Sequence, residues 1–149
     1  MKRVPTLAGC RNVVLDTMVF IYLFEDQPSY GTLCEELIRQ VEKKIFSGLI
    51  TPITAAEILV KPLRAKRADI ADRYRQALAN LPNITPCTFT AETGFIAGAL
   101  RAHYGLPLPD MLQAAAALQY GEGILITNDR HLRRITELRV ILLDDMARP

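Results

Sequence analysis

Short apolar segments alternate with longer amphipathic segments along the chain. The apolar segments are rich in valine, isoleucine and leucine and show no polar alternation, which is typical of strands buried on both faces. We therefore predict strands at residues 12–16, 48–51, 84–89, 123–127 and 139–143. The third of these is the weakest prediction, because Pro86 interrupts it.

Helical spacing separates the predicted strands. Between residues 33 and 46, apolar side chains recur every three or four positions, which predicts an amphipathic helix. Further helices are predicted at residues 54–60, with Pro62 near the end, at 65–81, at 91–104 with Gly105 as a cap, and at 110–120. Strands that alternate with helices indicate an α/β fold, a three-layer α/β/α sandwich with a mostly parallel sheet.

Composition narrows the class of protein. With 149 residues, of which 50% are hydrophobic and 23% charged, the sequence predicts one folded domain over residues 1–149. No apolar run reaches the roughly 18–20 residues that would span a membrane. The formal net charge of +2 is too small to indicate a nucleic-acid partner by itself. Three separated cysteines, Cys10, Cys34 and Cys87, favour a reducing cytoplasm over disulfide or zinc chemistry.

Four acidic residues stand after predicted strands or at the start of a predicted helix. Asp16 and Asp129 follow the first and fourth strands, and Glu57 lies shortly after the second. Asp110 opens the alanine-rich helix. Because ligands of parallel α/β sheets bind outside the carboxyl ends of the strands, the four carboxylates could converge on one cleft.

Each acid also has a purely structural alternative. Asp110 and Asp129 could cap helices, and Asp16 could hold a turn. Glu57 could face solvent, although its apolar neighbours make the solvent-facing side of that helix narrow. The functional interpretation rests on the set, because four carboxylates brought close together repel one another and a divalent cation removes that conflict. Oxygen ligands without Cys or His favour Mg²⁺ or Mn²⁺ over zinc. The predicted reaction is hydrolysis of a phosphodiester by metal-activated water.

The order of the acidic segments resembles the PIN domain, and more narrowly the VapC-type toxins of bacterial and archaeal toxin–antitoxin pairs. The segments that carry the resemblance are Val-Val-Leu-Asp16-Thr17, Ala-Ala-Glu57-Ile-Leu-Val, Leu-Pro-Asp110-Met-Leu-Gln-Ala-Ala and Leu-Ile-Thr127-Asn128-Asp129-Arg. Each segment is short, but their order is specific and they extend over nearly the whole chain. The resemblance implies an endoribonuclease that depends on Mg²⁺ or Mn²⁺, forms homodimers and is inhibited by a small antitoxin protein.

The resemblance also implies roles for individual residues. The acidic, metal-holding site would comprise Asp16, Glu57, Asp110 and Asp129. Thr17, Thr127 and Asn128 match the polar positions beside it, which hold water or orient ligands. One departure stands out, because the second residue after the first acid is often polar in the family and is Met18 here. Met18 removes one hydrogen bond beside the site, which leaves the number of bound metals open.

Basic residues next to two of the acids are candidates for contact with RNA phosphates. Lys61 and Arg64 lie in a basic segment just after Glu57, and Arg130 adjoins Asp129. A solvated helix face with local ion pairs is an equal alternative for the first segment.

Other polar and aromatic residues carry weaker signals. His103 and His131 fit no metal motif and are interpreted as surface or packing residues. We interpret Phe20, Tyr22 and Phe24 as helix and dimer packing rather than as a base-stacking surface.

The leading hypothesis is a cytoplasmic, metal-dependent endoribonuclease of the toxin type, with RNA as substrate, an antitoxin as partner and no membrane attachment. A second hypothesis is a non-cleaving RNA-binding or protein-binding module built on the same fold. A third is a receiver-type module with Asp16 as phospho-acceptor, which ranks low because no lysine follows a late strand in the expected place.

Overall fold

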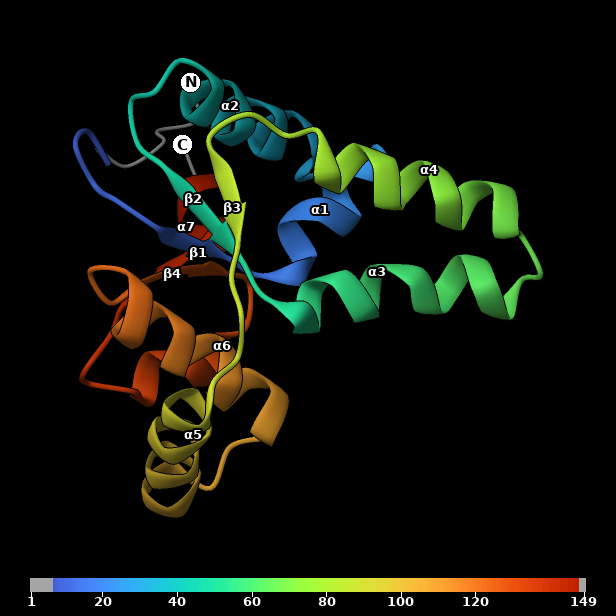
Figure 1. Cartoon of the computed structure of the whole chain (residues 1–149). Coiled ribbons are helices and arrows are strands. Elements are labelled where there is room, and N and C mark those ends of the chain that lie inside the picture. Colours follow the sequence, from blue (N-terminus) through green and yellow to red (C-terminus); the bar gives the residue numbers. More distant parts are fainter. Residues whose placement is uncertain (1–6, 148–149) are drawn as a thin grey trace.

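A five-stranded parallel sheet forms the centre of the structure, a computed structural model that describes residues 7–147 (Figure 1). The strands are β1 (Val13–Leu15), β2 (Gly48–Ile50), β3 (Ile84–Pro86), β4 (Ile124–Thr127) and β5 (Arg139–Leu142). Their spatial order is β3-β2-β1-β4-β5, and every neighbouring pair is parallel. All five predicted strands are confirmed, and the first strand of the chain lies in the middle of the sheet.

The edge strand β3 is shorter than the predicted segment at residues 84–89. It ends at Pro86, whose nitrogen carries no hydrogen, so this position is tolerated only because it is at an edge. One further backbone bond follows, from the Cys87 N–H to the Ile50 carbonyl at 2.8 Å. The chain then leaves the sheet before the next helix begins.

Alternation of side chains along β1 builds two separate cores. Val13 and Leu15 pack with α1 (Thr17–Phe24), α2 (Gly31–Glu42) and α7 (Leu143–Ala147). Val14 packs on the opposite face with α5 (Ala91–Tyr104) and α6 (Leu108–Tyr120). The predicted three-layer sandwich is therefore confirmed, with helices on both faces of the sheet (Figure 1).

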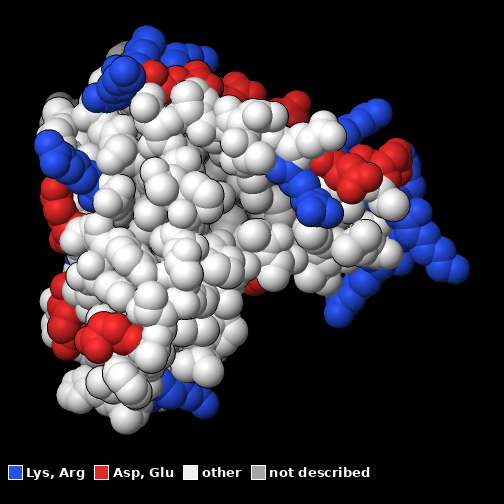
Figure 2. Space-filling model, in the orientation of Figure 1, with Lys and Arg blue, Asp and Glu red and all other residues white. Residues whose placement is uncertain are grey.

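Helices α3 (Pro52–Arg64) and α4 (Ala68–Ala79) pair side by side and extend away from the sheet as a hairpin (Figure 1). Lys and Arg side chains gather at its far end (Figure 2). The predicted helix at residues 54–60 is too short, because Pro62 lies inside α3 rather than ending it. A proline in the last turn removes a single helical hydrogen bond, and Ala65 still donates to the Lys61 carbonyl.

The remaining helix boundaries differ from the prediction by a few residues. Helix α2 starts at Gly31 and stops at Glu42, not at residue 46, because Lys44 adopts a positive φ of 60°. Helix α4 is likewise shorter than the predicted 65–81, and α6 begins at Leu108 instead of residue 110. Helix α5 matches its prediction, including the left-handed cap at Gly105. Helix α7 was not predicted.

None of the helices within residues 7–147 is long and apolar enough to span a lipid bilayer. Cys10, Cys34 and Cys87 are all free thiols.

Candidate functional site

The order in which the chain adds strands to the sheet reverses between β1 and β4. From β1 the chain moves outward to β2 and then β3, and it returns to the other side of β1 to form β4 and β5. Ligands of open parallel sheets bind at such a reversal, outside the carboxyl ends of the two strands. Asp16 directly follows β1, and Asp129 comes two residues after the end of β4.

Asp16 is the most firmly held of the four acids. Only 8% of the residue is exposed, and its Oδ1 accepts hydrogen bonds from the Thr17 backbone N–H (2.8 Å) and from Gln113 Nε2 (3.1 Å). Its Oδ2 accepts from Thr127 Oγ1 at 2.6 Å, a bond that joins the ends of β1 and β4. Asp16 is also the N-cap of α1, so a structural role and a position at the site coexist.

Glu57 reaches the same site from α3. Thr17 Oγ1 donates to Glu57 Oε1 at 3.1 Å and lies 3.1 Å from Thr54 Oγ1. Burial of the carboxylate, together with repulsion from Asp16, raises the pKa of Glu57, whereas the bond from Thr17 lowers it. Glu57 also faces solvent, as its structural alternative predicted, but the exposed face is not narrow, because Ala55 and Ala56 are exposed as well.

Asp110 lies in the first turn of α6 and is not its N-cap, which is Pro107. The alternative of a simple helix cap is therefore wrong for this residue. Burial raises the pKa of Asp110 to about 6, with further contributions from the negative charges of Asp16, Asp129 and Glu57, in that order. Asp110 therefore lies close enough to three acids distant in sequence to be affected by their charges.

Asp129 caps the short helix η1 (Arg130–Arg134), as its structural alternative predicted. Its Oδ1 accepts from the His131 backbone N–H at 2.9 Å and lies 2.9 Å from His131 Nδ1. Its own N–H donates to Thr127 Oγ1 at 3.1 Å, so Thr127 contacts both Asp16 and Asp129. His131 is exposed, as expected, and also lies against an acid of the site.

Asn128 is directed away from Asp16, toward α1 and α7. Its Oδ1 accepts from the Asp144 backbone N–H at 3.0 Å, and its Nδ2 donates to the Tyr22 hydroxyl at 3.4 Å. Among the three polar positions beside the acids, Thr17 and Thr127 therefore contact the carboxylates directly. Asn128 instead connects the end of β4 to the helices behind the site.

Gln113 belongs to the candidate site and was missed by sequence analysis. It is 1% exposed, and its Nε2 donates to Asp16 Oδ1 and to Thr54 Oγ1, both at 3.1 Å. Its Oε1 accepts from the Thr51 hydroxyl. The available signal was its spacing, because residues three apart on a helix share a face, which places Gln113 beneath Asp110 on α6.

The donor set is of the kind that binds a hard divalent cation, since it consists of carboxylates without a thiolate. As the side chains stand, no three His, Cys, Asp or Glu residues within the described range 7–147 are arranged to hold a metal ion. Both carboxylate oxygens of Asp16 accept hydrogen bonds from other side chains, and Asp129 Oδ1 contacts His131. The repulsion felt by Asp110 is the conflict that a cation would relieve.

Two of the three predicted phosphate-contacting residues lie beside Glu57. Lys61 and Arg64 line a cavity of about 600 Å³ together with Glu57, and Lys61 also pairs with Glu25 at 2.9 Å. Arg130 pairs with Asp144 at 3.1 Å. Basic side chains therefore border the acidic site at both ends.

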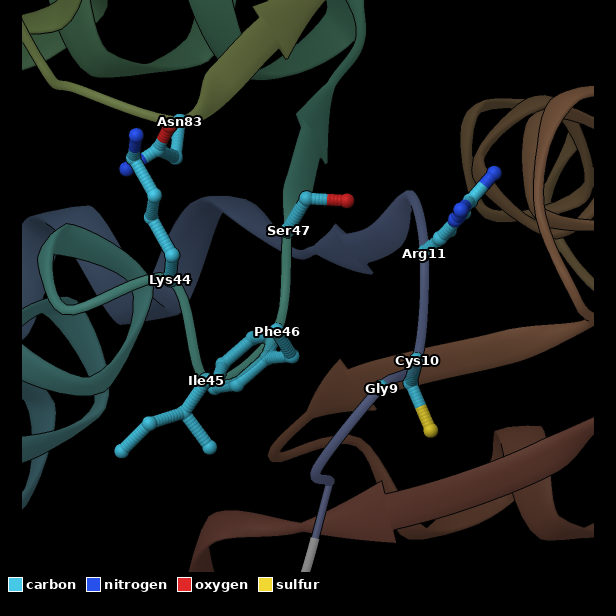
Figure 3. A pocket seen from close by; sticks show the side chains of 8 residues that line it. All are labelled: Gly9, Cys10, Arg11, Lys44, Ile45, Phe46, Ser47 and Asn83. Carbon is cyan, nitrogen blue, oxygen red and sulfur yellow. The ribbon is translucent and has the colours of Figure 1, made fainter.

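A different cavity, of about 320 Å³, lies at the opposite end of the sheet (Figure 3). Residues 9–11, 44–47 and 83 line it, and each of these segments precedes a strand. No acidic residue contributes to its lining, so it is separate from the site at the carboxyl ends.

Fold and site together define a parallel α/β protein with a carboxylate-rich site where the strand order reverses. A family model described as "PIN domain" matches residues 13–138. Because this match spans most of the sequence, the chain belongs to the PIN domain family. The comparison with curated protein sequences found no match to the chain.

Several solved structures share the fold. One is VapBC2 from Rickettsia felis bound to a promoter DNA fragment, with 23% identity and a TM-score of 0.66 over 87% of this chain and 97% of that chain. A toxin–antitoxin complex from Klebsiella pneumoniae has 22% identity and a TM-score of 0.66 over 89% and 98%. VapBC-1 from nontypeable Haemophilus influenzae has 20% identity and a TM-score of 0.65 over the same shares. At these identities the likeness shows the fold.

Proposed function

We propose that this chain is a VapC-type toxin, an endoribonuclease that depends on Mg²⁺ or Mn²⁺ and hydrolyses RNA phosphodiester bonds. The observation that carries the proposal is that acids from separate parts of the chain meet through shared threonine partners at the carboxyl ends of β1 and β4. Thr17 bonds to Glu57, and Thr127 bonds to both Asp16 and Asp129. Burial, with further contributions from these acids, raises the pKa of the neighbouring Asp110 to about 6. A protein that needed no cation there would gain stability by replacing some of these acids. Membership of the PIN domain family supports the same conclusion.

The four acids would hold the cation between β1, β4, α3 and α6. They are Asp16, Glu57, Asp110 and Asp129. When bound, Mg²⁺ or Mn²⁺ neutralises phosphate charge and lowers the pKa of a water ligand, which supplies a nucleophile at neutral pH. The number of ions stays open, and Met18 contributes no polar group beside Asp16.

The surrounding side chains keep the carboxylates oriented. Thr127 and Gln113 donate to the two oxygens of Asp16, and the N-terminal end of α1 stabilises its negative charge. Thr17 orients Glu57 through the bond from Oγ1 to Oε1. Hydrogen-bond partners of this kind fix the direction of a ligand and tune its basicity.

RNA would lie across the acids with its phosphates close to basic side chains on both sides. Lys61 and Arg64 flank Glu57, and Arg130 follows Asp129 directly. Lysine and arginine neutralise phosphate charge and release counterions, which supplies affinity without sequence preference. The ion pairs Lys61–Glu25 and Arg130–Asp144 are solvent-accessible, so a phosphate can replace the carboxylate in either pair.

An antitoxin protein and a second copy of the chain are the proposed partners. The similar structure from Klebsiella pneumoniae is described as a toxin–antitoxin complex, and this chain covers 98% of the matched chain. The free thiols fit a cytoplasmic location. A short neighbouring reading frame that encodes a DNA-binding protein would support the antitoxin assignment.

Cleavage of RNA by the purified protein tests the proposal. We expect cleavage with Mn²⁺ or Mg²⁺, none with EDTA, and none by an Asp16→Asn variant with an unchanged circular dichroism spectrum. Equal cleavage in all three conditions would refute the metal-dependent mechanism. Binding of several RNAs without cleavage in any metal would instead favour the non-cleaving module.

A further inference from the structure

A cavity of about 440 Å³ opens directly beside the acidic site. Its lining consists of Met18, Tyr22, Asn128, Asp129, Arg130 and His131. Asp129 therefore faces both the acidic site and this cavity. Its volume is within the usual range for small-ligand sites. We propose that the cavity is a nucleobase pocket, which takes one unpaired base of the RNA next to the phosphate that is cleaved. This inference rests on the proposed function.

The side chains of the wall match the surfaces of a base. Tyr22 and His131 present aromatic rings, and Met18 presents a polarisable thioether, all of which pack well against a flat ring. Beyond its bonds to Asp144 and Tyr22, the Asn128 amide has one further hydrogen and one further lone pair, which can bond to the edge of the base. Proteins recognise unpaired RNA bases with this combination of stacking surfaces and edge contacts.

The wall is fixed from behind by residues that do not line the cavity. The ring of Tyr30 stacks on Tyr22 with centroids 4.7 Å apart and planes at 15°. The Tyr30 hydroxyl donates to the Asp144 carboxylate, and the Asp144 N–H donates to Asn128 Oδ1 at 3.0 Å. Asp144 thus holds Asn128 directly and the ring of Tyr22 through Tyr30, which lowers the entropy lost when a ligand binds.

Arg130 suits a base that carries a phosphate. Its pair with Asp144 at 3.1 Å is solvent-accessible, so the phosphate attached to a bound base can compete with that carboxylate for the guanidinium. A cationic protein side chain would instead be attracted by Asp129, so arginine amide is the competing probe in the test below. The pocket also gives Met18 a role, since a polar residue there would be a poorer stacking surface.

Methyl NMR of the protein labelled with [¹³C-methyl]methionine tests the pocket in EDTA, so that no cleavage occurs. The probes are 2′-O-methyl RNA trinucleotides, the four nucleoside monophosphates and arginine amide. We expect the trinucleotides to shift the Met18 methyl signal through the ring current of the stacked base. The signals of Met111 and Met146, which are 0% and 2% exposed, serve as internal controls and should not move. A Met18→Leu variant identifies the responding signal.

Variants of Tyr22 provide the matched comparison. Tyr22→Leu should weaken trinucleotide binding about tenfold or more through loss of stacking, whereas Tyr22→Phe should retain it. Equal binding by the wild type and Tyr22→Leu would overturn the proposal. So would a Met18 response to arginine amide alone, which indicates a protein side chain, or equal affinity for mononucleotides and trinucleotides, which indicates a free nucleotide. Since EDTA is present, RNA binding here is independent of whether the protein cleaves RNA.

Discussion

The two ends of the same parallel sheet are built in different ways. At the amino ends of the strands, the segments around the cavity of Figure 3 are tied mainly by main-chain bonds, such as that from the Gly9 N–H to the Ile45 carbonyl at 2.9 Å. At the carboxyl ends, side chains bond to side chains, as Thr127 and Gln113 do to Asp16. Main-chain hydrogen bonds can form with almost any side chains, whereas the side-chain hydrogen bonds at the carboxyl ends require these particular residues.

The ends also differ in charge. The cavity at the amino ends is bordered by Arg11 and Lys44 and by no acid, whereas four acids interact at the carboxyl ends. Concentrated like charge destabilises a fold and is retained where chemistry needs it. From this difference we expect function to depend on the carboxyl ends, and a double variant at the amino ends, Arg11→Gln with Lys44→Gln, provides a control.

The largest effect is expected from Asp16→Asn. The amide keeps the shape of the side chain but removes the charge that would hold the cation, so RNA cleavage should fall about a thousandfold. Initial rates with Mn²⁺ measure the loss. The control variant at the amino ends should cleave at the wild-type rate, and an equal loss in both variants would mean that the two ends do not differ in function.

A smaller effect is expected from Thr127→Val, which removes the hydroxyl between Asp16 and Asp129 without changing the volume. Misorientation of the two carboxylates should lower the apparent Mn²⁺ affinity about 10–100-fold. The Mn²⁺ dependence of the cleavage rate measures this change. Thr85→Val in the edge strand β3 is the matched control, because Thr85 is an exposed strand threonine outside the site. A normal Mn²⁺ dependence of Thr127→Val would contradict the role of its hydroxyl.

Asp110→Asn should stabilise the metal-free protein. The pKa of Asp110 is raised to about 6 from 3.8, so the folded wild type binds this proton more tightly than the unfolded chain does. Wild-type stability therefore falls as pH rises from about 4 to above 6, and the variant avoids a loss of about 1 kcal/mol after screening by water.

Thermal unfolding in EDTA at pH 4.5 and 7.5 measures this difference. The variant should gain a few degrees over the wild type at pH 7.5 and less at pH 4.5. Added Mn²⁺ should raise the unfolding temperature of the wild type and have little effect on the variant. A variant that is less stable than the wild type at pH 7.5 would show that burial and the neighbouring negative charges do not destabilise the ionised form of Asp110.

The smallest effect is expected from Lys61→Gln combined with Arg64→Gln. Loss of two phosphate contacts should raise KM a few-fold at moderate salt, with kcat unchanged. The slope of log binding constant against log salt should decrease by about 1.4, at about 0.7 for each contact with a single strand. Fluorescence anisotropy with a labelled RNA at several KCl concentrations measures the slope. An unchanged slope would mean that these residues form an ordinary solvated helix face.

Sequence alone determined the layers of the fold and the place of two acids. The apolar segments predicted strands buried on both faces, which is confirmed for β1, β2 and β4 but wrong for the edge strands β3 and β5, which are partly exposed. Residues that follow parallel strands lie at one edge of the sheet, as Asp16 and Asp129 do. The cap at Gly105 was equally readable, because a left-handed residue ends a helix locally.

Only the tertiary structure decided what surrounds the acids. Gln113 on α6 meets Asp16 and Thr54 from two other elements, and Asp144 on the unpredicted α7 fixes the wall formed by Asn128 and Arg130. Local pattern also failed at Pro62, where packing of α3 against α4 outweighs the loss of one helical bond. Periodicity reports which face of an element is buried, but contacts between residues distant in sequence depend on how the elements pack, which no local pattern encodes.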